Sequence, residues 1–152
     1  MSKLKLGDSI PSFELKDQEE NLINSNSLKG KPLVIYFYPK DDTPGCTAQA
    51  CSFRDNYEEF EELGALVIGI SGDSPKSHLK FAQKHRLPFM LLSDVGNKVR
   101  KQFGVPGSLF GMLPGRVTYV FDNKGSLIHI FNSQLKAKAH IPEALRQLQK
   151  TV

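Results

Sequence analysis

Cys46 is the residue of this chain whose position most clearly suggests chemistry. Thr43 and Pro44 precede it, and these residue types are typical of the N-cap and the first position of an α-helix. Cys46 would then lie in the first helical turn, where unpaired backbone N–H groups and the positive end of the helix dipole favour the thiolate. A thiolate is the form of cysteine that attacks an electrophile, so Cys46 is a candidate nucleophile. The alternative is that its side chain is a small buried hydrophobic group.

The second cysteine, Cys51, lies five residues further along the same predicted helix. In an intact helix the two Cα atoms would be roughly 8.6 Å apart, and the side chains would point in directions about 140° apart. A disulfide needs Cα atoms within about 7 Å, so the two cysteines can bond only if the first turns unwind. Gly45 lowers the cost of that unwinding. The spacing alone leaves open whether Cys51 is a redox partner or an inert helix residue.

The pattern around these cysteines predicts a single domain, residues 1–152, in which strands and helices alternate before a final hairpin. The predicted strands are 13–15, 22–24, 33–38, 65–70, 89–92, 117–121 and 127–131, and the predicted helices are 43–63, 73–85, 96–103 and 140–150. Segment 25–31 is predicted to be a turn-rich connection and 104–116 a long irregular loop. This order predicts an α/β fold with a mixed central sheet and helices on both faces. The loop that delivers Cys46 follows strand 33–38, at the carboxyl end where the active sites of such folds gather.

Composition and charge disfavour several other classes of protein. The chain has 152 residues, of which 39% are hydrophobic and 24% charged, as is ordinary for a globular domain. Its net charge of +4 comes from scattered basic residues, so we expect no nucleic-acid partner, whereas an acidic protein partner is compatible with it. The apolar runs are too short to cross a membrane and the first residues lack a secretory signal, so we expect a cytoplasmic location, or an organellar one if a transit peptide has been removed. The two cysteines and four histidines lack the spacing of metal ligands, and we expect no metal and no cofactor.

The residues that lead to the first cysteine, Pro39-Lys-Asp-Asp-Thr43-Pro-Gly-Cys46, resemble the Pro-x-x-x-Thr-x-x-Cys signature of peroxiredoxins. They follow a predicted strand and open a predicted helix, which is the context that this signature requires. Cys51 resembles the resolving cysteine of the peroxiredoxin Q group, which is also called the bacterioferritin comigratory protein group. Residues 7–13, 49–55, 67–71 and 109–119 are similar to the same group, so the resemblance covers nearly the whole chain.

The resemblance implies a thioredoxin-like fold and a thiol-dependent peroxidase that reduces hydrogen peroxide and organic hydroperoxides. By the same resemblance, Cys46 is the peroxidatic cysteine, and Thr43 hydrogen-bonds both the peroxide and the thiolate. Pro39 shields the site, and Arg116 completes it from a distant part of the chain.

Elementary electrostatics also requires a cation such as Arg116. Asp41 and Asp42 oppose ionisation of the neighbouring thiol, so a positive charge from elsewhere is needed to offset them. An arginine keeps its charge in a protein, and its N–H groups can stabilise the charge that shifts between the peroxide oxygens as their bond breaks. Without the resemblance, the alternative is that Arg116 is an exposed surface residue.

The catalytic cycle implied by the resemblance has three steps. The Cys46 thiolate attacks the peroxide and becomes a sulfenic acid, the start of the helix unwinds, and Cys51 forms an intramolecular disulfide with it. Thioredoxin, or a similar dithiol reductant, then restores both thiols. Disulfide formation competes with overoxidation of Cys46 to sulfinic acid. We expect the protein to act as a monomer and to serve as an antioxidant in cell redox homeostasis.

Two functions from other classes are also compatible with the composition. One is a thioredoxin-like thiol–disulfide oxidoreductase without peroxide chemistry, which the missing Cys-x-x-Cys pair disfavours. The other is a binding or chaperone-like module that uses the basic surface. The preferred peroxide stays open, because the apolar residues of loop 104–116 either admit organic hydroperoxides or pack inward. These residues are Leu109, Phe110, Met112 and Leu113.

Overall fold

The inner strands form from the continuous apolar runs of the sequence. In the computed structural model, which describes residues 4–105, 115–132 and 137–150, strand β3 (Leu33–Phe37) is buried along its whole length. It pairs in parallel with β4 (Leu66–Ser71), which in turn pairs in parallel with β5 (Met90–Ser93). On its other side β3 pairs antiparallel with β6 (Val117–Phe121). The strands joined by helical crossovers are therefore parallel, as the predicted element order requires.

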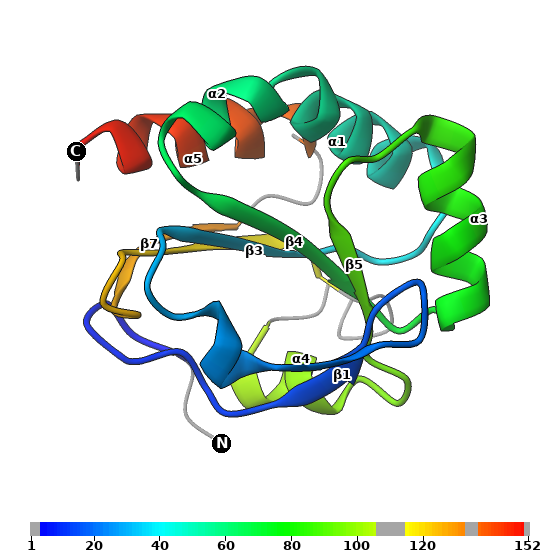
Figure 1. Ribbon diagram of the computed structural model, residues 1–152, viewed down its shortest axis with the longest axis horizontal. Helices are drawn as coiled ribbons and strands as arrows, with labels where there is room; N and C mark the ends of the chain where they lie inside the picture. The colour runs from blue at the N-terminus through cyan, green and yellow to red at the C-terminus, as the bar shows by residue number, and fades with distance from the viewer. Residues whose placement is uncertain (1–3, 106–114, 133–136, 151–152) are drawn as a thin grey trace.

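Short antiparallel strands complete both edges of the sheet. β7 (Leu127–Asn132) forms the predicted hairpin with β6, with a bulge between Val120 and Phe121. β1 (Glu14–Lys16) and β2 (Leu22–Asn24), which lie within one residue of the predicted strands 13–15 and 22–24, pair with each other at the opposite edge. The result is a seven-stranded mixed sheet in the order β2-β1-β5-β4-β3-β6-β7 (Figure 1).

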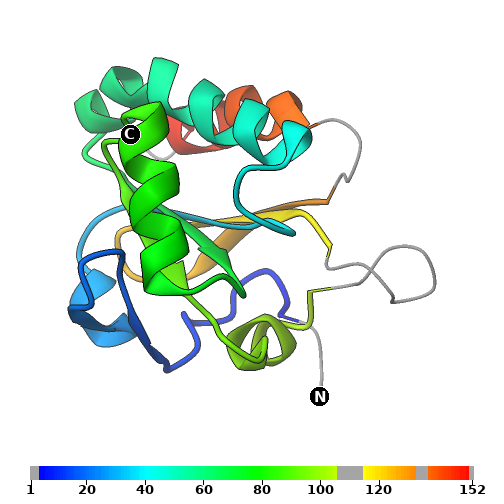
Figure 2. The same cartoon turned by 90° about the vertical axis from the view of Figure 1, so that its right-hand side faces the viewer.

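Helices cover both faces of this sheet, which confirms the predicted layers (Figure 2). Val34 and Tyr36 of β3 belong to one apolar cluster, whereas Leu33 and Ile35 belong to the other, because successive side chains of a strand point to opposite faces. The first cluster is covered by α1 (Pro44–Asp55), α2 (Tyr57–Glu62), α3 (Pro75–His85) and α5 (His140–Gln149), which η2 (Ala137–Ala139) precedes. The second is covered by η1 (Ser25–Leu28) and α4 (Lys98–Phe103).

Two local predictions need correction. The helix predicted over 43–63 is interrupted at Asn56, whose backbone leaves the helical region (φ −108°, ψ 10°). The side-chain amide of Asn56 donates a hydrogen bond to the Ser52 carbonyl at 2.8 Å, and such local bonds compete with a continuous helix. The connection 25–31 contains the helix η1, because the Asn24 side chain accepts a hydrogen bond from the Asn26 N–H at 2.9 Å and caps it.

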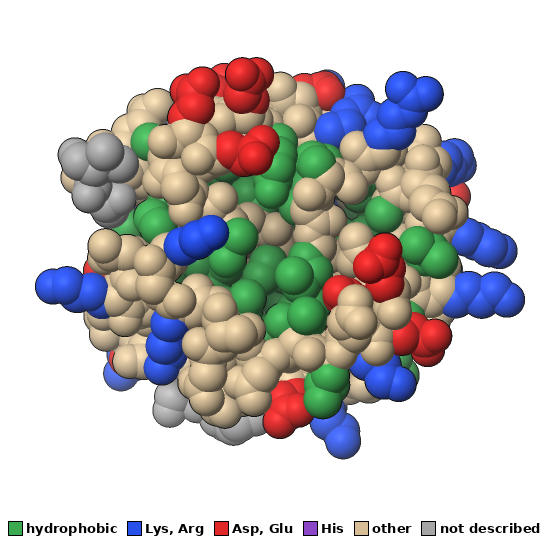
Figure 3. Space-filling view, viewed as in Figure 1, with side chains coloured by type: hydrophobic (Ala, Val, Ile, Leu, Met, Phe, Trp, Pro, Cys, Tyr) green, Lys and Arg blue, Asp and Glu red, His purple; other side chains and the backbone are tan. Residues whose placement is uncertain are grey.

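The surface carries charges of both signs. On the face shown in Figure 3, basic and acidic side chains are interspersed around the rim, and apolar side chains line the hollowed centre. Within the described residues, none of the helices has the length and apolar character that a membrane crossing requires. The charge pattern on this face agrees with the scattered basic residues of the sequence.

Candidate active site

Helix α1 places Cys46 where the sequence predicts it. Thr43 has the extended backbone of an N-cap (φ −95°, ψ 154°), Pro44 opens the helix, and Cys46 follows in the first turn. The Thr43 hydroxyl does not cap the helix, however, because it donates a hydrogen bond to the Lys40 carbonyl at 2.9 Å. The first N–H groups of α1 therefore have no side-chain cap from Thr43, and the positive end of the helix dipole lies near Cys46 in the first turn.

A distant arginine lies against this sulfur. Arg116 Nη2 is 3.4 Å from Cys46 Sγ, although the two residues are 70 positions apart in the chain. Both are buried, since 1% of Cys46 and 4% of Arg116 are exposed, and burial strengthens their electrostatic interaction. The alternative of an exposed surface arginine is therefore wrong for Arg116. Its guanidinium lies where the sequence analysis requires a cation.

Two residues of α1 hold this guanidinium in place. Arg116 Nη1 donates a hydrogen bond to Gln49 Oε1, and Gln49 is fully buried one turn after Cys46. Gly45 lets the guanidinium approach the helix closely, because a Cβ atom at this position would be only 3.0 Å from Arg116 Nη2. The sequence alone points to no role for Gln49 and connects Gly45 only with unwinding. Neither contact can be foreseen without knowing where Arg116 lies.

The two carboxylates that oppose ionisation of the thiol have partners of their own. Asp42 is exposed and pairs with Lys84, whose Nζ lies 3.1 Å from Asp42 Oδ1. The hydrogen bond from Lys84 lowers the pKa of Asp42. Asp41 is buried and accepts hydrogen bonds from Tyr38 and Ser77. Lys84 offsets the negative charge of Asp42, and two hydroxyl groups solvate the carboxylate of Asp41, so less of each field opposes a thiolate at the start of α1.

Two tyrosines near the site, Tyr36 of β3 and Tyr38 directly after β3, add no charge to it. Tyr36 and Tyr38 are both fully buried, and burial raises the pKa of each phenol well above its usual range. A thiolate at Cys46 would raise the pKa of Tyr36 further, and the negative charge of Asp41 raises the pKa of Tyr38 further. Both phenols therefore stay neutral near physiological pH.

Comparison with known proteins identifies the family. The sequence model of the AhpC/TSA family matches residues 6–130 of this chain. The chain belongs to the AhpC/TSA family. A chloroplastic peroxiredoxin Q from Populus jackii is 57% identical over 148 residues, which cover 97% of this chain and 70% of that protein. Peroxidoxin BcpB from Mycobacterium tuberculosis has a similar crystal structure, with a TM-score of 0.89, 38% identity and coverage of 98% of this chain and 99% of that one.

A third relative is the bacterioferritin comigratory protein of Xanthomonas campestris. Its structure has a TM-score of 0.83 and 30% identity, over 91% of this chain and 90% of that one. Together these similarities confirm the resemblance to the peroxiredoxin Q group and the thioredoxin-like fold. This AhpC/TSA family member is an oxidoreductase, a thiol peroxidase that reduces peroxides.

A second buried arginine in this peroxidase connects the two segments that carry the site. Arg100 Nη2 donates to the Tyr38 carbonyl and Arg100 Nη1 to the Gly115 carbonyl, each at 2.7 Å. Burial lowers the pKa of Arg100 to about 10. This bridge fixes the end of β3 relative to the segment that enters β6. The only sequence signal for it is a charged residue between Val99 and Phe103 on the apolar side of a short helix.

The remaining predicted residues are placed as follows. Cys51 is half-buried, and both cysteines are free thiols within an intact α1, in agreement with the spacing argument. Pro39 is half-buried directly after β3 and Tyr38. The redox role of Cys51 and the shielding role of Pro39 stay predictions. The four apolar loop residues that bear on the peroxide preference lie within 106–114, outside the described residues.

Proposed function

We propose that Cys46 is the peroxidatic cysteine of this thiol peroxidase, Cys51 its resolving cysteine, and a thioredoxin-type dithiol protein its reductant. The observation that carries this proposal is the 3.4 Å contact between Arg116 Nη2 and Cys46 Sγ at the start of α1. The helix start and the guanidinium both favour a thiolate in a buried setting. Cys51 is the only other cysteine of the chain, so it is the only internal thiol that can resolve an oxidised Cys46.

In the first step the Cys46 thiolate attacks one oxygen of the peroxide. A sulfur–oxygen bond forms, the oxygen–oxygen bond breaks, and the departing oxygen takes a proton and leaves as water or an alcohol. Sulfur is oxidised to a sulfenic acid while the peroxide is reduced. Arg116 stabilises the charge that moves onto the departing oxygen. The Thr43 oxygen still has a lone pair with which it can accept a hydrogen bond from the peroxide O–H, and Pro39 limits the water that reaches the sulfur.

The burial of the sulfur restricts the substrate. Only 1% of Cys46 is exposed, so a peroxide reaches it through a narrow opening or after a small movement of its neighbours. The Xanthomonas campestris relative has alkyl peroxide reduction activity. We therefore propose organic hydroperoxides as well as hydrogen peroxide as substrates. Failure to consume tert-butyl hydroperoxide in a peroxide-consumption assay would contradict the wider substrate range.

In the second step the Cys51 thiol attacks the sulfur of the sulfenic acid. A sulfur–sulfur bond forms, and the hydroxyl group leaves with the Cys51 proton as water. Two Cα atoms five positions apart in a helix are roughly 8.6 Å apart, which is beyond the reach of a disulfide, so the first turns of α1 must unwind. Until they do, a second peroxide can oxidise the sulfenic acid further, to a sulfinic acid.

A dithiol protein completes the cycle. One of its thiolates attacks the Cys46–Cys51 disulfide and forms a mixed disulfide, and its second thiol releases the peroxidase with both cysteines reduced. Two electrons pass from the dithiol to the peroxidase, and the partner leaves as a disulfide. The unwound start of α1 exposes the disulfide for this exchange.

The contacts of the site and the relatives bear on the oligomeric state and the location. Cys46, Arg116 and Gln49 come from one chain, so the contacts of the site need no second copy, and we propose a monomer. A dimeric mass in light scattering would contradict it. The Populus jackii and Sedum lineare relatives are named chloroplastic, which supports the organellar alternative over a cytoplasmic location. Cell fractionation tests this.

Two cysteine variants test the catalytic assignment. Cys46→Ser should consume no peroxide, whereas Cys51→Ser should consume one equivalent and then fail to turn over with thioredoxin. Peroxide consumption is followed with the thioredoxin system, and the products are identified by mass spectrometry. Continued turnover of Cys46→Ser would contradict the role of Cys46, and full cycling of Cys51→Ser would mean that another thiol resolves the sulfenic acid.

A further inference from the structure

We propose that His78 is a positioning residue: it holds Asp41, and the two residues together form a buried clamp that sets how readily α1 unwinds for disulfide formation. The inference rests on the proposed roles of Cys46 and Cys51. It concerns the loop between β3 and α1, which delivers Cys46, and it assigns a function to a buried charged cluster that the chemical steps do not use.

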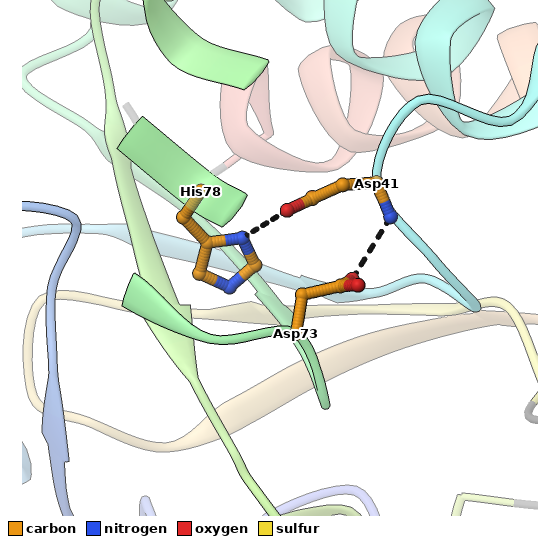
Figure 4. A group of neighbouring side chains, drawn as sticks. All are labelled: Asp41, Asp73 and His78. Atoms are coloured by element: carbon orange, nitrogen blue, oxygen red, sulfur yellow. Dashed lines mark hydrogen bonds and ion pairs between the residues drawn. The ribbon is translucent and has the colours of Figure 1, made fainter. Parts of the chain in front are cut away.

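The clamp is a network of short hydrogen bonds around Asp41, and Figure 4 shows two of them, between His78 and Asp41 and between Asp41 and Asp73. His78 Nδ1 lies 2.7 Å from Asp41 Oδ2, and both side chains are buried. The Tyr38 hydroxyl donates to Asp41 Oδ1 at 2.6 Å, and the Ser77 hydroxyl donates to Asp41 Oδ2 at 2.8 Å. The backbone N–H of Asp41 donates to Asp73 Oδ2 at 2.9 Å. Side chain and backbone of Asp41 are thus both bound to α3 and to the segment that precedes it.

Both ring nitrogens of His78 face hydrogen-bond partners. Its Nε2 faces the Leu92 carbonyl at 3.0 Å, and a carbonyl oxygen can only accept. Its Nδ1 faces Asp41, which already accepts hydrogen bonds from two hydroxyl groups, as an ionised carboxylate does. An imidazolium facing a carboxylate satisfies all of these hydrogen bonds, and we infer that the pair has this form.

The same atoms could be read as a cation site, because Asp41, Asp73 and His78 offer ligand atoms that all lie within 4.8 Å of one another. Each of these groups is instead hydrogen-bonded within the cluster or to its neighbours. A buried ion pair satisfied in this way holds its surroundings in one arrangement, and removal of one partner leaves an uncompensated charge. The cluster is therefore a structural clamp.

The clamp lies immediately before the helix that must unwind. Only Asp42 and Thr43 separate Asp41 from the first residue of α1. Asp42 adopts the left-handed conformation (φ 61°), which is unfavourable for a residue with a side chain and is held here by its surroundings. The Thr43 carbonyl accepts the first helical hydrogen bond, from the Thr47 N–H at 2.8 Å. The direction in which the chain leaves Asp41 thus determines where α1 begins.

Fixing Asp41 makes the unwound state less favourable without blocking the reaction. When the start of α1 unwinds, the released segment begins after Asp41, and without the clamp it would also include the preceding loop residues. Each additional released residue adds backbone freedom to the unwound state and so favours unwinding. Five extended residues from a fixed Asp41 to Cys46 still span about 17 Å, so Cys46 can move toward Cys51.

The clamp therefore affects which of two reactions the sulfenic acid of Cys46 undergoes, disulfide formation with Cys51 or further oxidation by peroxide. The wound helix holds Cys46 against Arg116 for reaction with peroxide, and the unwound helix allows the disulfide. As long as the wound form dominates, a weaker clamp raises the unwound population and hence the rate of disulfide formation in proportion, while oxidation by peroxide changes little. Faster resolution also protects Cys46 from a second oxidation.

Two variants test this prediction. Asp41→Asn keeps the shape of the side chain and removes its charge, and His78→Leu removes both ring hydrogen bonds. In rapid-quench mass spectrometry we expect disulfide formation to become about tenfold faster, which corresponds to about 1.4 kcal/mol. The peroxide concentration that gives half-maximal sulfinic acid should rise by the same factor. The first oxidation, which is measured separately in the same traces, should be unchanged or faster in Asp41→Asn, because the removed charge opposes the thiolate.

Leu28→Ala is the control, because Leu28 is buried in the apolar cluster on the opposite face of the sheet. It should lower the melting temperature without changing the rate of disulfide formation. Unchanged resolution in the clamp variants, or an equal acceleration in Leu28→Ala, would overturn the clamp. A wild-type protein that forms no Cys46–Cys51 disulfide would instead contradict the proposed function.

A measurement on the unaltered protein covers the case in which the variants fail to fold. The nitrogen chemical shifts of the His78 ring should show that both nitrogens are protonated, and the ring protons should be protected from exchange with water. A shift typical of an unprotonated ring nitrogen would contradict the ion pair on which the clamp depends.

Discussion

Replacing Gly45 by alanine should slow both oxidation of the peroxidase and its resolution. Glycine is less favourable than alanine in a helix by roughly 0.5–1 kcal/mol, so Gly45→Ala stabilises the wound start of α1. If disulfide formation depends on unwinding, this difference makes it about twofold to fivefold slower. The variant should also form more sulfinic acid at a given peroxide concentration.

The added methyl group also acts on the arginine. Its carbon would lie 3.0 Å from Arg116 Nη2, inside ordinary van der Waals contact, so the guanidinium must move by a few tenths of an ångström. The contact between the guanidinium of Arg116 and the sulfur of Cys46 is a hydrogen bond to a charged group, and such bonds contribute about 1.5–3 kcal/mol. If the movement weakens this bond by a third, the transition state for oxidation loses about 0.5–1 kcal/mol of stabilisation. Oxidation of Cys46 should therefore also become about twofold to fivefold slower.

Rapid-quench mass spectrometry of the reduced protein measures both rate constants separately. Ala48→Gly, in the same helix between the two cysteines, is the matched control. It should make disulfide formation about twofold to fivefold faster and leave the first oxidation unchanged. If Gly45→Ala accelerated disulfide formation, or if Ala48→Gly left it unchanged, helix unwinding would not control resolution.

Three further predictions concern the buried charged and phenolic groups. Arg116→Lys replaces the planar guanidinium by a point charge, and oxidation by hydrogen peroxide, measured by competition with a reference peroxidase, should become about 10²–10³-fold slower; an unchanged rate constant would remove Arg116 from the site. Arg100→Met leaves two buried carbonyls without donors, so urea denaturation should show a free energy of unfolding lower by about 2–6 kcal/mol, and a loss within error would refute the bridge. Burial raises the pKa of all four tyrosines, to about 12 for Tyr119. The pKa of tyrosine in the unfolded chain is about 10, so above that pH the native state binds more protons than the unfolded state. The stability that the raised pKa values contribute is therefore complete below about pH 10 and is lost as the pH rises through the pKa values of the folded protein. Most of the phenolate absorbance should therefore appear together with unfolding at a pH above about 10, and titration of Tyr36, Tyr38 or Tyr119 near pH 10 in the folded protein would contradict their burial.

Much of the fold follows from local patterns in the sequence. The apolar runs of β3, β4 and β6 and the hairpin are recognisable because a strand buried on both faces needs apolar residues throughout. The start of α1 is recognisable because Thr43 and Pro44 have backbone preferences that act within a few residues. The interruption at Asn56 was missed because the side chain has a local alternative to helical bonding that competes with the apolar periodicity.

By itself, the sequence determined the chemistry: a cysteine at a helix start, and a second cysteine that an intact helix keeps out of reach. Arg116 entered only through resemblance, because no local rule pairs residues 70 positions apart. The tertiary structure alone decided what surrounds the sulfur. Gln49 and Gly45 hold the guanidinium, Arg100 bridges two segments, and His78 binds Asp41. Such contacts depend on how α3, α4 and β6 pack around the loop after β3, and packing between distant segments leaves no periodic signal in the sequence.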